Sequence, residues 1–227
     1  MRHETLPGAR HLQPIPGFAP AAPEMLLCGC PDLVGTSFSY SREEEIFGEG
    51  EEADFVYRVV KGAVRTCKML SDGRRQIDAF HLPGDLFGFE MGARHRMTAE
   101  AVADTTVLLF RRRQIEETAH RNVDAACRLW DLTLRSLGHA QEHMILLGRR
   151  TALERVAAFL IHMDERLGGT GHVDLAMPRR DIADYLGLTL ETVSRALSQL
   201  QSEGALRLDG ARKVTLDRKR MATIVED

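Results

Sequence analysis

Two kinds of hydrophobic spacing divide the chain near Arg113. Over residues 33–110, short runs rich in β-branched and aromatic residues alternate with turn signals. These runs cover 55–60, 63–70, 76–82 and 105–110. The pair Asp72-Gly73 favours a two-residue hairpin turn, because both central positions of a type I′ turn need positive φ. The pattern predicts an antiparallel β sandwich or barrel.

Beyond Arg113 the hydrophobic period changes from two to three and a half. Six residues follow the spacing of the a and d positions of a coiled coil: Cys127, Trp130, Leu134, Leu137, Gln141 and Met144. This spacing predicts a long helix with a dimer seam, in which Gln141 would help to fix the register. The pattern spans fewer than three heptads, so an amphipathic helix that packs on its own domain is the alternative.

The C-terminal part predicts two short helices joined by a glycine turn. Residues 178–186 begin with a proline and end before Gly187, and a helix over 190–203 follows Thr189, which suits an N-cap. A β-hairpin is predicted beyond Gly204, with strands over 205–208 and 213–216. Two helices, a glycine turn and a following hairpin describe a winged helix-turn-helix.

The second of these helices carries side chains suited to reading DNA bases. Its predicted buried stripe consists of Leu190, Val193, Leu197 and Leu200. The predicted base-reading residues on the open face are Glu191, Ser194 and Arg195. Arginine donates two hydrogen bonds to guanine, glutamate accepts one from cytosine, and serine allows close approach. For Glu191 and Arg195 taken alone, a salt bridge on a solvated helix is the alternative.

Charge and composition narrow the class of protein. The chain has 227 residues, 28% of them charged, and a net charge of -3. Residues 149–227 hold 13 Lys and Arg against 12 Asp and Glu, so DNA contact must depend on local placement of charge. Four cysteines (28, 30, 67 and 127), no secretory leader and no long apolar run predict a cytoplasmic protein that does not enter membranes.

Several short segments match the motifs of a known family in order and separation. They are Gly48-Glu49-Gly50, residues 56–64 (VYRVVKGAV), 83–88 (PGDLFG), 181–187 (DIADYLG) and 191–195 (ETVSR). On these segments the chain resembles the CRP/FNR superfamily of bacterial transcription regulators. The resemblance implies an α+β fold with an N-terminal antiparallel β-roll (jelly-roll-like, cyclic-nucleotide-binding-like) sensor domain, a long dimerisation helix and a C-terminal winged helix-turn-helix. We expect a disordered or extended proline-rich arm over 1–24, the roll over 25–120, the dimerisation helix over 121–148 and the DNA-binding domain over 149–227.

The Glu-x-x-Ser-Arg pattern at 191, 194 and 195 is similar to the FNR and FixK branch. That resemblance implies a homodimer on double-stranded DNA at a palindromic TTGAT-N4-ATCAA site, RNA polymerase as a partner, activation, and low-oxygen or nitrogen-fixation-related control. The loop 71–75 is either a polymerase contact or a solvated hairpin tip. By the same match, the residues that contact DNA phosphates would be Arg179, Thr189, Thr192 and Ser198.

No small-molecule effector or cofactor is expected. In nucleotide-binding members an arginine pairs with the cyclic phosphate, but here Met97 stands at that position, although Arg94 or Arg96 would reach in after a register shift. Iron-sulfur members have three closely spaced N-terminal cysteines, whereas only Cys28 and Cys30 are close here. The chain therefore resembles FixK-type regulators, which lack both effector sites.

Two other functions compete with DNA reading. Residues 139–143 match H-x-x-E-H, a zinc motif of metallohydrolases, through His139, Glu142 and His143. No third ligand is identifiable, and two polar histidines on a solvated helix face are expected instead, so we predict no enzyme, no catalytic residue and no metal ligand. The other alternative is an interaction module whose winged helix contacts protein only.

Overall fold

The computed structural model describes Leu27, Cys30 and residues 33–149 and 151–226. The expected arm over 1–24 and Cys28 lie outside these residues. The chain divides into two compact units. The first combines Met1–Lys68 with Phe80–Ser136, and the second combines Met69–Ala79 with Leu137–Asp227. The tip of one β-hairpin therefore groups with the C-terminal part of the chain.

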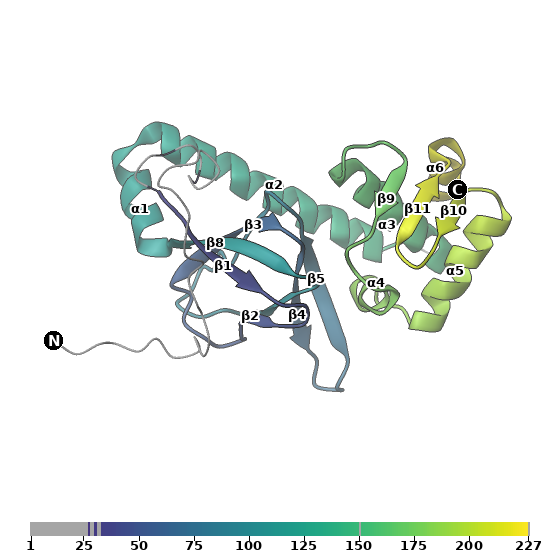
Figure 1. The fold of residues 1–227 in the computed structure, drawn as a ribbon, viewed down its shortest axis with the longest axis horizontal. Coiled ribbons are helices and arrows are strands. Elements are labelled where there is room, and N and C mark those ends of the chain that lie inside the picture. Colours follow the sequence, from purple (N-terminus) through teal and green to yellow (C-terminus); the bar gives the residue numbers. More distant parts are fainter. Residues whose placement is uncertain (1–26, 28–29, 31–32, 150, 227) are drawn as a thin grey trace. The chain divides into compact units, whose positions relative to one another are not determined.

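The N-terminal half folds into two four-stranded antiparallel sheets (Figure 1). Their strand orders are β1-β8-β3-β6 and β2-β7-β4-β5. The strands are β1 (Thr36–Tyr40), β2 (Glu45–Phe47), β3 (Phe55–Lys61), β4 (Val64–Met69), β5 (Arg75–His81), β6 (Leu86–Phe87), β7 (Thr98–Ala101) and β8 (Thr105–Arg111). The four predicted runs correspond to β3, β4, β5 and β8, and the predicted antiparallel β-roll is confirmed.

The β4–β5 hairpin closes differently from the prediction. The backbone N–H of Gly73 donates to the carbonyl of Leu70 at 3.0 Å, and the N–H of Leu70 donates to the carbonyl of Arg74 at 2.8 Å. Gly73 has a φ of 82°, whereas Asp72 keeps a negative φ. The connection is therefore a three-residue loop with glycine in the left-handed position. The predicted type I′ turn is wrong, because Oδ1 of Asp72 accepts from the N–H of Arg74 at 3.0 Å and stabilises the longer loop.

An aromatic cluster with an embedded histidine lies inside the first unit. Phe47, Tyr57 and Phe87 are buried, and the ring of His95 stacks on Phe47 with 3.6 Å between centroids. Neither ring nitrogen of His95 has a hydrogen-bond partner, and Glu90 lies 3.7 Å from Nδ1, too far for a hydrogen bond. Burial lowers the pKa of His95, and the Glu90 carboxylate opposes that shift. His95 is thus a neutral imidazole at pH 7.

Gly62 joins β3 to β4 where the chain passes close to the start of β8. Its φ is 85°, in the left-handed region. A Cβ atom at this position would lie 2.6 Å from the backbone oxygen of Asp104 and would also meet the hydroxyl of Thr105. Both the conformation and the close approach therefore require glycine.

Two helices follow the roll: α1 (Arg112–Arg121) and α2 (Val123–Leu147). Oδ1 of Asn122 accepts a hydrogen bond from the backbone N–H of Ala125 at 3.0 Å and so caps the start of α2. Ala125 is buried, and Leu129 and Leu132 pack against the core of the first unit. One face of α2 therefore packs against the first unit. This helix corresponds to the one predicted over 121–148.

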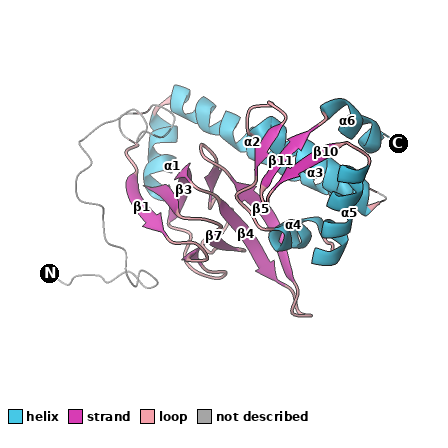
Figure 2. Ribbon diagram, turned by 45° about the vertical axis from the view of Figure 1, so that its right-hand side comes forward, coloured by secondary structure: helices cyan, strands magenta, loops and turns pink. Residues whose placement is uncertain are grey.

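The second unit contains four further helices and a three-stranded sheet (Figure 2). Its elements are α3 (Ala152–Arg166), β9 (His172–Asp174), α4 (Arg179–Leu186), α5 (Leu190–Ser202), β10 (Leu206–Asp209), β11 (Lys213–Leu216) and α6 (Arg218–Glu226). The sheet order is β10-β11-β9, and α3 packs against α5 and α6. Gly187, with a φ of 64°, ends α4, and the side chain of Thr189 caps α5 by accepting from the N–H of Thr192. The predicted winged helix-turn-helix is confirmed.

No helix among the described residues combines the length and the apolar character that a membrane span requires.

Candidate nucleic-acid interface

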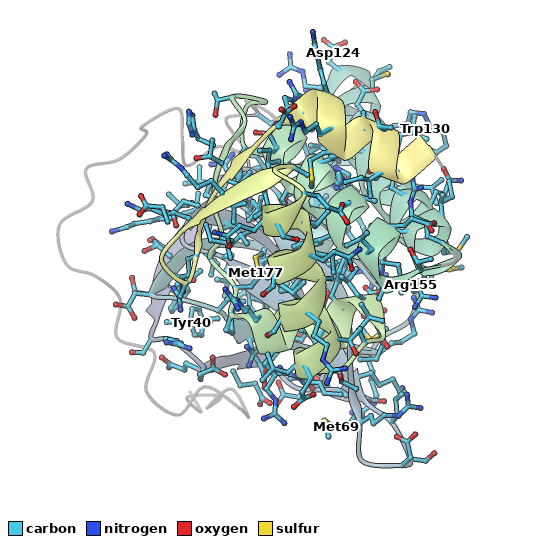
Figure 3. The ribbon with its side chains drawn as sticks, turned by 90° about the vertical axis from the view of Figure 1, so that its right-hand side faces the viewer. Tyr40, Met69, Asp124, Trp130, Arg155 and Met177 are labelled. Atoms are coloured by element: carbon cyan, nitrogen blue, oxygen red, sulfur yellow. The ribbon has the colours of Figure 1, made fainter. Side chains whose placement is uncertain are left out.

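Helix α5 buries one face and exposes the other. Its buried residues are Val193, Ala196, Leu197 and Leu200. On the opposite side, Glu191 and Arg195 are exposed and Ser194 is half-buried. These three residues lie one helical turn apart or less and share a face with the exposed Ser198. Figure 3 draws the side chains of this part of the chain as sticks, with the ribbon in the colours of Figure 1. The predicted base-reading residues are therefore accessible, and their contact with DNA stays a prediction.

Leu190 departs from the predicted buried stripe. Its side chain is 42% exposed, so its assignment to the core is wrong. Leu190 is the first residue of α5, directly after the Thr189 cap, and the helix packs through the later positions 193, 196, 197 and 200. Ala196 is buried on this face instead, although it was not among the residues predicted to be buried. The exposed end of α5 thus presents an apolar side chain beside Glu191.

The start of α5 is organised for hydrogen bonding. The hydroxyls of Thr189 and Thr192 lie 3.0 Å apart, and Thr189 also accepts from the backbone N–H of Thr192 at 3.2 Å. The pKa of Glu191 is lowered, first by a hydrogen bond from its own backbone N–H, then by the Thr189 hydroxyl, with Arg195 adding an attractive charge. Glu191 is therefore an ionised hydrogen-bond acceptor, as pairing with a cytosine amino group requires.

The four predicted phosphate-contacting residues lie at the starts of the two helices and along α5. Arg179 is half-buried at the first position of α4, Thr189 is exposed and Thr192 is half-buried. Ser198 is exposed, and its hydroxyl donates to the carbonyl of Ser194 at 3.0 Å. The hydroxyls already make local bonds, so phosphate contacts there would use the backbone amides of the α5 N-terminus or hydroxyl lone pairs. The four phosphate contacts stay predictions.

The predicted dimer seam is exposed along α2. The exposed fractions of its large apolar side chains are 64% for Trp130, 45% for Leu134, 52% for Leu137 and 69% for Met144. Cys127 and Gln141 are also exposed. Ala125, Leu129 and Leu132, in contrast, pack against the core of the first unit. The helix therefore has one covered apolar face and one open apolar face.

The H-x-x-E-H residues point to different neighbours. His143 is buried: its ring stacks on Tyr185 at 3.8 Å, and Nε2 lies 2.9 Å from the Tyr185 carbonyl oxygen. Oε2 of Glu142 lies 2.8 Å from Nε2 of His162, whose pKa is lowered chiefly by burial. The expectation that both histidines lie on a solvated face is wrong for His143. Over the described residues, no group of three His, Cys, Asp or Glu side chains is arranged to hold a metal.

The two arginines near the predicted phosphate position, Arg94 and Arg96, both bond to groups of the roll itself. Nη1 of Arg94 donates to the carbonyl of Gly50 at 2.5 Å, and Nε of Arg96 lies 3.2 Å from Oε2 of Glu90. Sequence reasoning did not single out His95, which lies buried between them in the chain. A polar residue that follows an exposed turn gives no hydropathy signal for burial, so only the packing reveals it.

Comparisons with known proteins agree with this architecture. Residues 37–122 match a model of the cyclic nucleotide-binding domain, and residues 154–224 match a model of the Crp-like helix-turn-helix domain. The chain is 48% identical to the nitrogen fixation regulation protein FixK of Azorhizobium caulinodans over 188 residues, which are 81% of this chain and 76% of that one. It is 43% identical to the transcriptional activatory protein AadR of Rhodopseudomonas palustris, over 80% of this chain and 77% of that one. The solved structure of FixK2 from Bradyrhizobium japonicum is similar with a TM-score of 0.80 and 57% identity, and the match covers 85% of this chain and 98% of that one.

Proposed function

Because the chain belongs to the CRP/FNR family of transcription regulators, we propose that it binds a palindromic TTGAT-N4-ATCAA site as a homodimer and recruits RNA polymerase. It is a helix-turn-helix activator of the FixK type, and its relatives are regulators rather than enzymes. Control in nitrogen fixation would follow the name of the FixK relative. Control by low oxygen would follow the resemblance to the FNR and FixK branch. Its targets are on DNA, so it would act in the cytoplasm.

The observation that carries this proposal is the exposed face of α5. In a major groove, Arg195 would donate two hydrogen bonds to guanine, and the ionised Glu191 would accept from cytosine. Ser194, half-buried between them, keeps the helix surface low enough for close approach. Arg179 would contact a phosphate and set the register without reading sequence.

Leu190 adds a base contact that its hydrophobicity alone did not suggest. It is 42% exposed at the first turn of α5, the end of a recognition helix whose residues reach base edges. An apolar side chain there is suited to the methyl group of thymine. Leu190 would therefore favour one of the thymines of the TTGAT half-site.

The open apolar face of α2 supports a homodimer. Two copies that pack through this face would bury four large apolar side chains each. A two-fold axis along the paired helices would present two α5 helices to successive major grooves, about 34 Å apart on one side of the duplex. A palindromic site follows from that symmetry.

Ligand-independent activity is supported by the residues around the expected phosphate position. Met97 offers no charge for a cyclic phosphate, and Arg96 pairs with Glu90. We therefore expect the purified chain to bind its site without an added effector.

Fluorescence anisotropy tests the proposal. Purified protein is titrated against the TTGAT-N4-ATCAA duplex and a scrambled duplex at fixed salt, because affinities at different salt concentrations cannot be compared. We expect tight binding to the palindrome only. Arg195→Ala should cost about 1–3 kcal/mol and relax preference at one base pair, whereas Arg179→Ala should weaken both duplexes alike and lower the salt slope by about one. Equal weak binding of wild type to both duplexes would contradict the proposal.

Removing one methyl group at a time from the DNA tests the proposed contact of Leu190. Each thymine of the half-site is replaced in turn by uracil, which lacks only the methyl group. One replacement should weaken wild-type binding and leave Leu190→Ala unaffected. If every replacement acts equally on wild type and variant, Leu190 does not contact a thymine methyl.

A further inference from the structure

Within the second unit, an arginine at the start of β5 pairs with two carboxylates of α4. Nε and Nη2 of Arg75 donate to Oδ2 of Asp184 at 2.9 and 2.8 Å, and Nη2 also donates to Oδ1 of Asp181 at 2.5 Å. The exposed fractions of the side chains are 21% for Arg75, 3% for Asp181 and 22% for Asp184. Because all three side chains are largely buried, salt screens this cluster less than a surface ion pair.

The same strand also contacts the far end of α4. Nε2 of Gln76 donates to the carbonyl of Tyr185 at 3.4 Å, and Nε2 of His143 lies 2.9 Å from the same oxygen. The last carbonyls of a helix have no partner inside it, so such donors fix its C-terminal end. Helix α4 is therefore held through the carboxylates of Asp181, in its first turn, and Asp184, in its second, and near its end through the carbonyl of Tyr185. The groups that hold it, on the hairpin and on α2, lie outside the helix-turn-helix.

The position of α5 is coupled to that of α4. Helix α4 has eight residues, too few to be stable without packing. A short turn over 187–189 joins the two helices, closed by the N–H of Leu188, which donates to the carbonyl of Ala183 at 2.9 Å. The two helices also pack against each other. A change in the tilt of α4 would therefore move the exposed face of α5.

We propose that Arg75 is a positioning residue for DNA recognition. By pairing with Asp181 and Asp184 it fixes α4, and through α4 it holds α5 in the orientation that reads DNA, with no bound ligand. This inference rests on the proposed DNA binding. Its neighbour Arg74 differs: it pairs with Asp72 inside the loop, and its side chain is 74% exposed. Figure 3 labels Met69, which begins the segment of hairpin that groups with the second unit.

Arg74→Ala is thus a matched control for Arg75→Ala. Both variants lose one positive charge from the same hairpin, and each is titrated by anisotropy on the palindromic and the scrambled duplex at several salt concentrations. Arg75→Ala should weaken binding to the palindrome about 10-fold, and Arg74→Ala by less than about 2-fold. Binding to the scrambled duplex should change by less than about 2-fold in both, because it depends on phosphate charge rather than on helix orientation.

Asp184→Asn separates positioning from a direct contact of Arg75 with DNA. If Arg75 acts through α4, Asp184→Asn also weakens specific binding, the double variant is no weaker than Arg75→Ala, and the salt slope stays at the wild-type value. If Arg75 binds a phosphate, the slope falls by about 0.9 on Arg75→Ala, and Asp184→Asn strengthens binding by removing a negative charge. The second pattern would overturn the proposal.

Two further results have distinct meanings. Wild type that discriminates between the duplexes, together with Arg75→Ala that behaves like Arg74→Ala, would overturn the positioning role and leave the proposed function intact. Wild type that does not discriminate would refute the proposed function and the positioning role with it. Circular dichroism checks folding. If Arg75→Ala is unfolded, Arg75→Lys and Asp184→Asn carry the test, with Arg75→Lys expected between wild type and Asp184→Asn.

Discussion

Replacing Asp164 should loosen the sheet of the wing. Asp164 lies in the last turn of α3 and is 1% exposed. Its Oδ1 accepts from the backbone N–H of Gly171 at 2.8 Å, one residue before β9, and its Oδ2 lies 3.1 Å from Nε of Arg218 at the start of α6. One carboxylate thus ties α3 to the strand that pairs with β11 and to the final helix.

The expected loss can be divided between the two oxygens. Asp164→Ala removes a hydrogen bond to a charged group and leaves a buried N–H without a partner, about 2–3 kcal/mol. Losing the ion pair adds at most about 1 kcal/mol, because Arg218 is 49% exposed and solvent screens it. The total is about 3 kcal/mol. Asp164→Asn keeps an oxygen for Gly171 and should cost about 1 kcal/mol.

Urea denaturation and hydrogen exchange measure this difference. The free energy of unfolding should fall in the order wild type, Asp164→Asn, Asp164→Ala, and the amides of β9 and β11 should exchange about 100-fold faster in the alanine variant. Arg218→Ala is the control and should cost less than about 1 kcal/mol. If Asp164→Asn and Asp164→Ala are equally destabilised, the hydrogen bond to Gly171 is not the source of the stability, and the division above is wrong.

Three further predictions concern the first unit and α2. Burial lowers the pKa of His95 in the folded chain, so the unfolded chain binds more protons below about pH 6.5. The free energy of unfolding should therefore fall as the pH drops below about 6.5, and it should fall less steeply in His95→Phe. Urea midpoints at pH 7.5 and 5.5 measure the difference. Gly62→Ala should cost more than about 2 kcal/mol, whereas Gly50→Ala, with similar φ and open space around it, should cost about 1 kcal/mol; equal losses would refute the steric argument. Leu137→Glu should dissociate the proposed dimer in analytical ultracentrifugation, and Arg135→Glu, on another side of α2, should not.

Hydrophobic period was sufficient to predict the longer elements of the fold. The strands β3, β4, β5 and β8 and the helices α2, α4 and α5 all span enough residues to show a period. Strands β2 and β6 have three and two residues, so no alternation can appear in them. Helix α6 follows β11 after a single residue, Asp217, whose Oδ1 accepts from the backbone N–H of Arg220 at 3.1 Å. An aspartate at this place is an N-cap signal that the prediction did not use.

Contacts between distant residues could not be predicted from local pattern. His143 occupies a polar stretch of α2, and its burial depends on Tyr185, 42 residues later. Arg75 was assigned to a loop, yet it meets carboxylates more than 100 residues away. A single sequence contains no information on such pairs except that the chain must partner each buried charge.

Leu190 and Arg75 depart from the usual preference of their residue types in opposite directions. A large apolar side chain is left 42% exposed at the tip of α5, and a guanidinium is largely buried against α4. Because Leu190 is exposed, the fold lacks part of the roughly 1.5–3 kcal/mol of stabilisation that full burial of a leucine side chain gives. No contact in the described part of the chain compensates for this loss. Burying an ion pair gains little net stability, because desolvation offsets the attraction. Both features are therefore costly or neutral for folding alone, and they lie on one route from the hairpin through α4 to the exposed end of α5. Departures from a consistent pattern are expected where a protein meets its ligand. These departures support both proposals: that the hairpin orients α5 and that Leu190 contacts DNA.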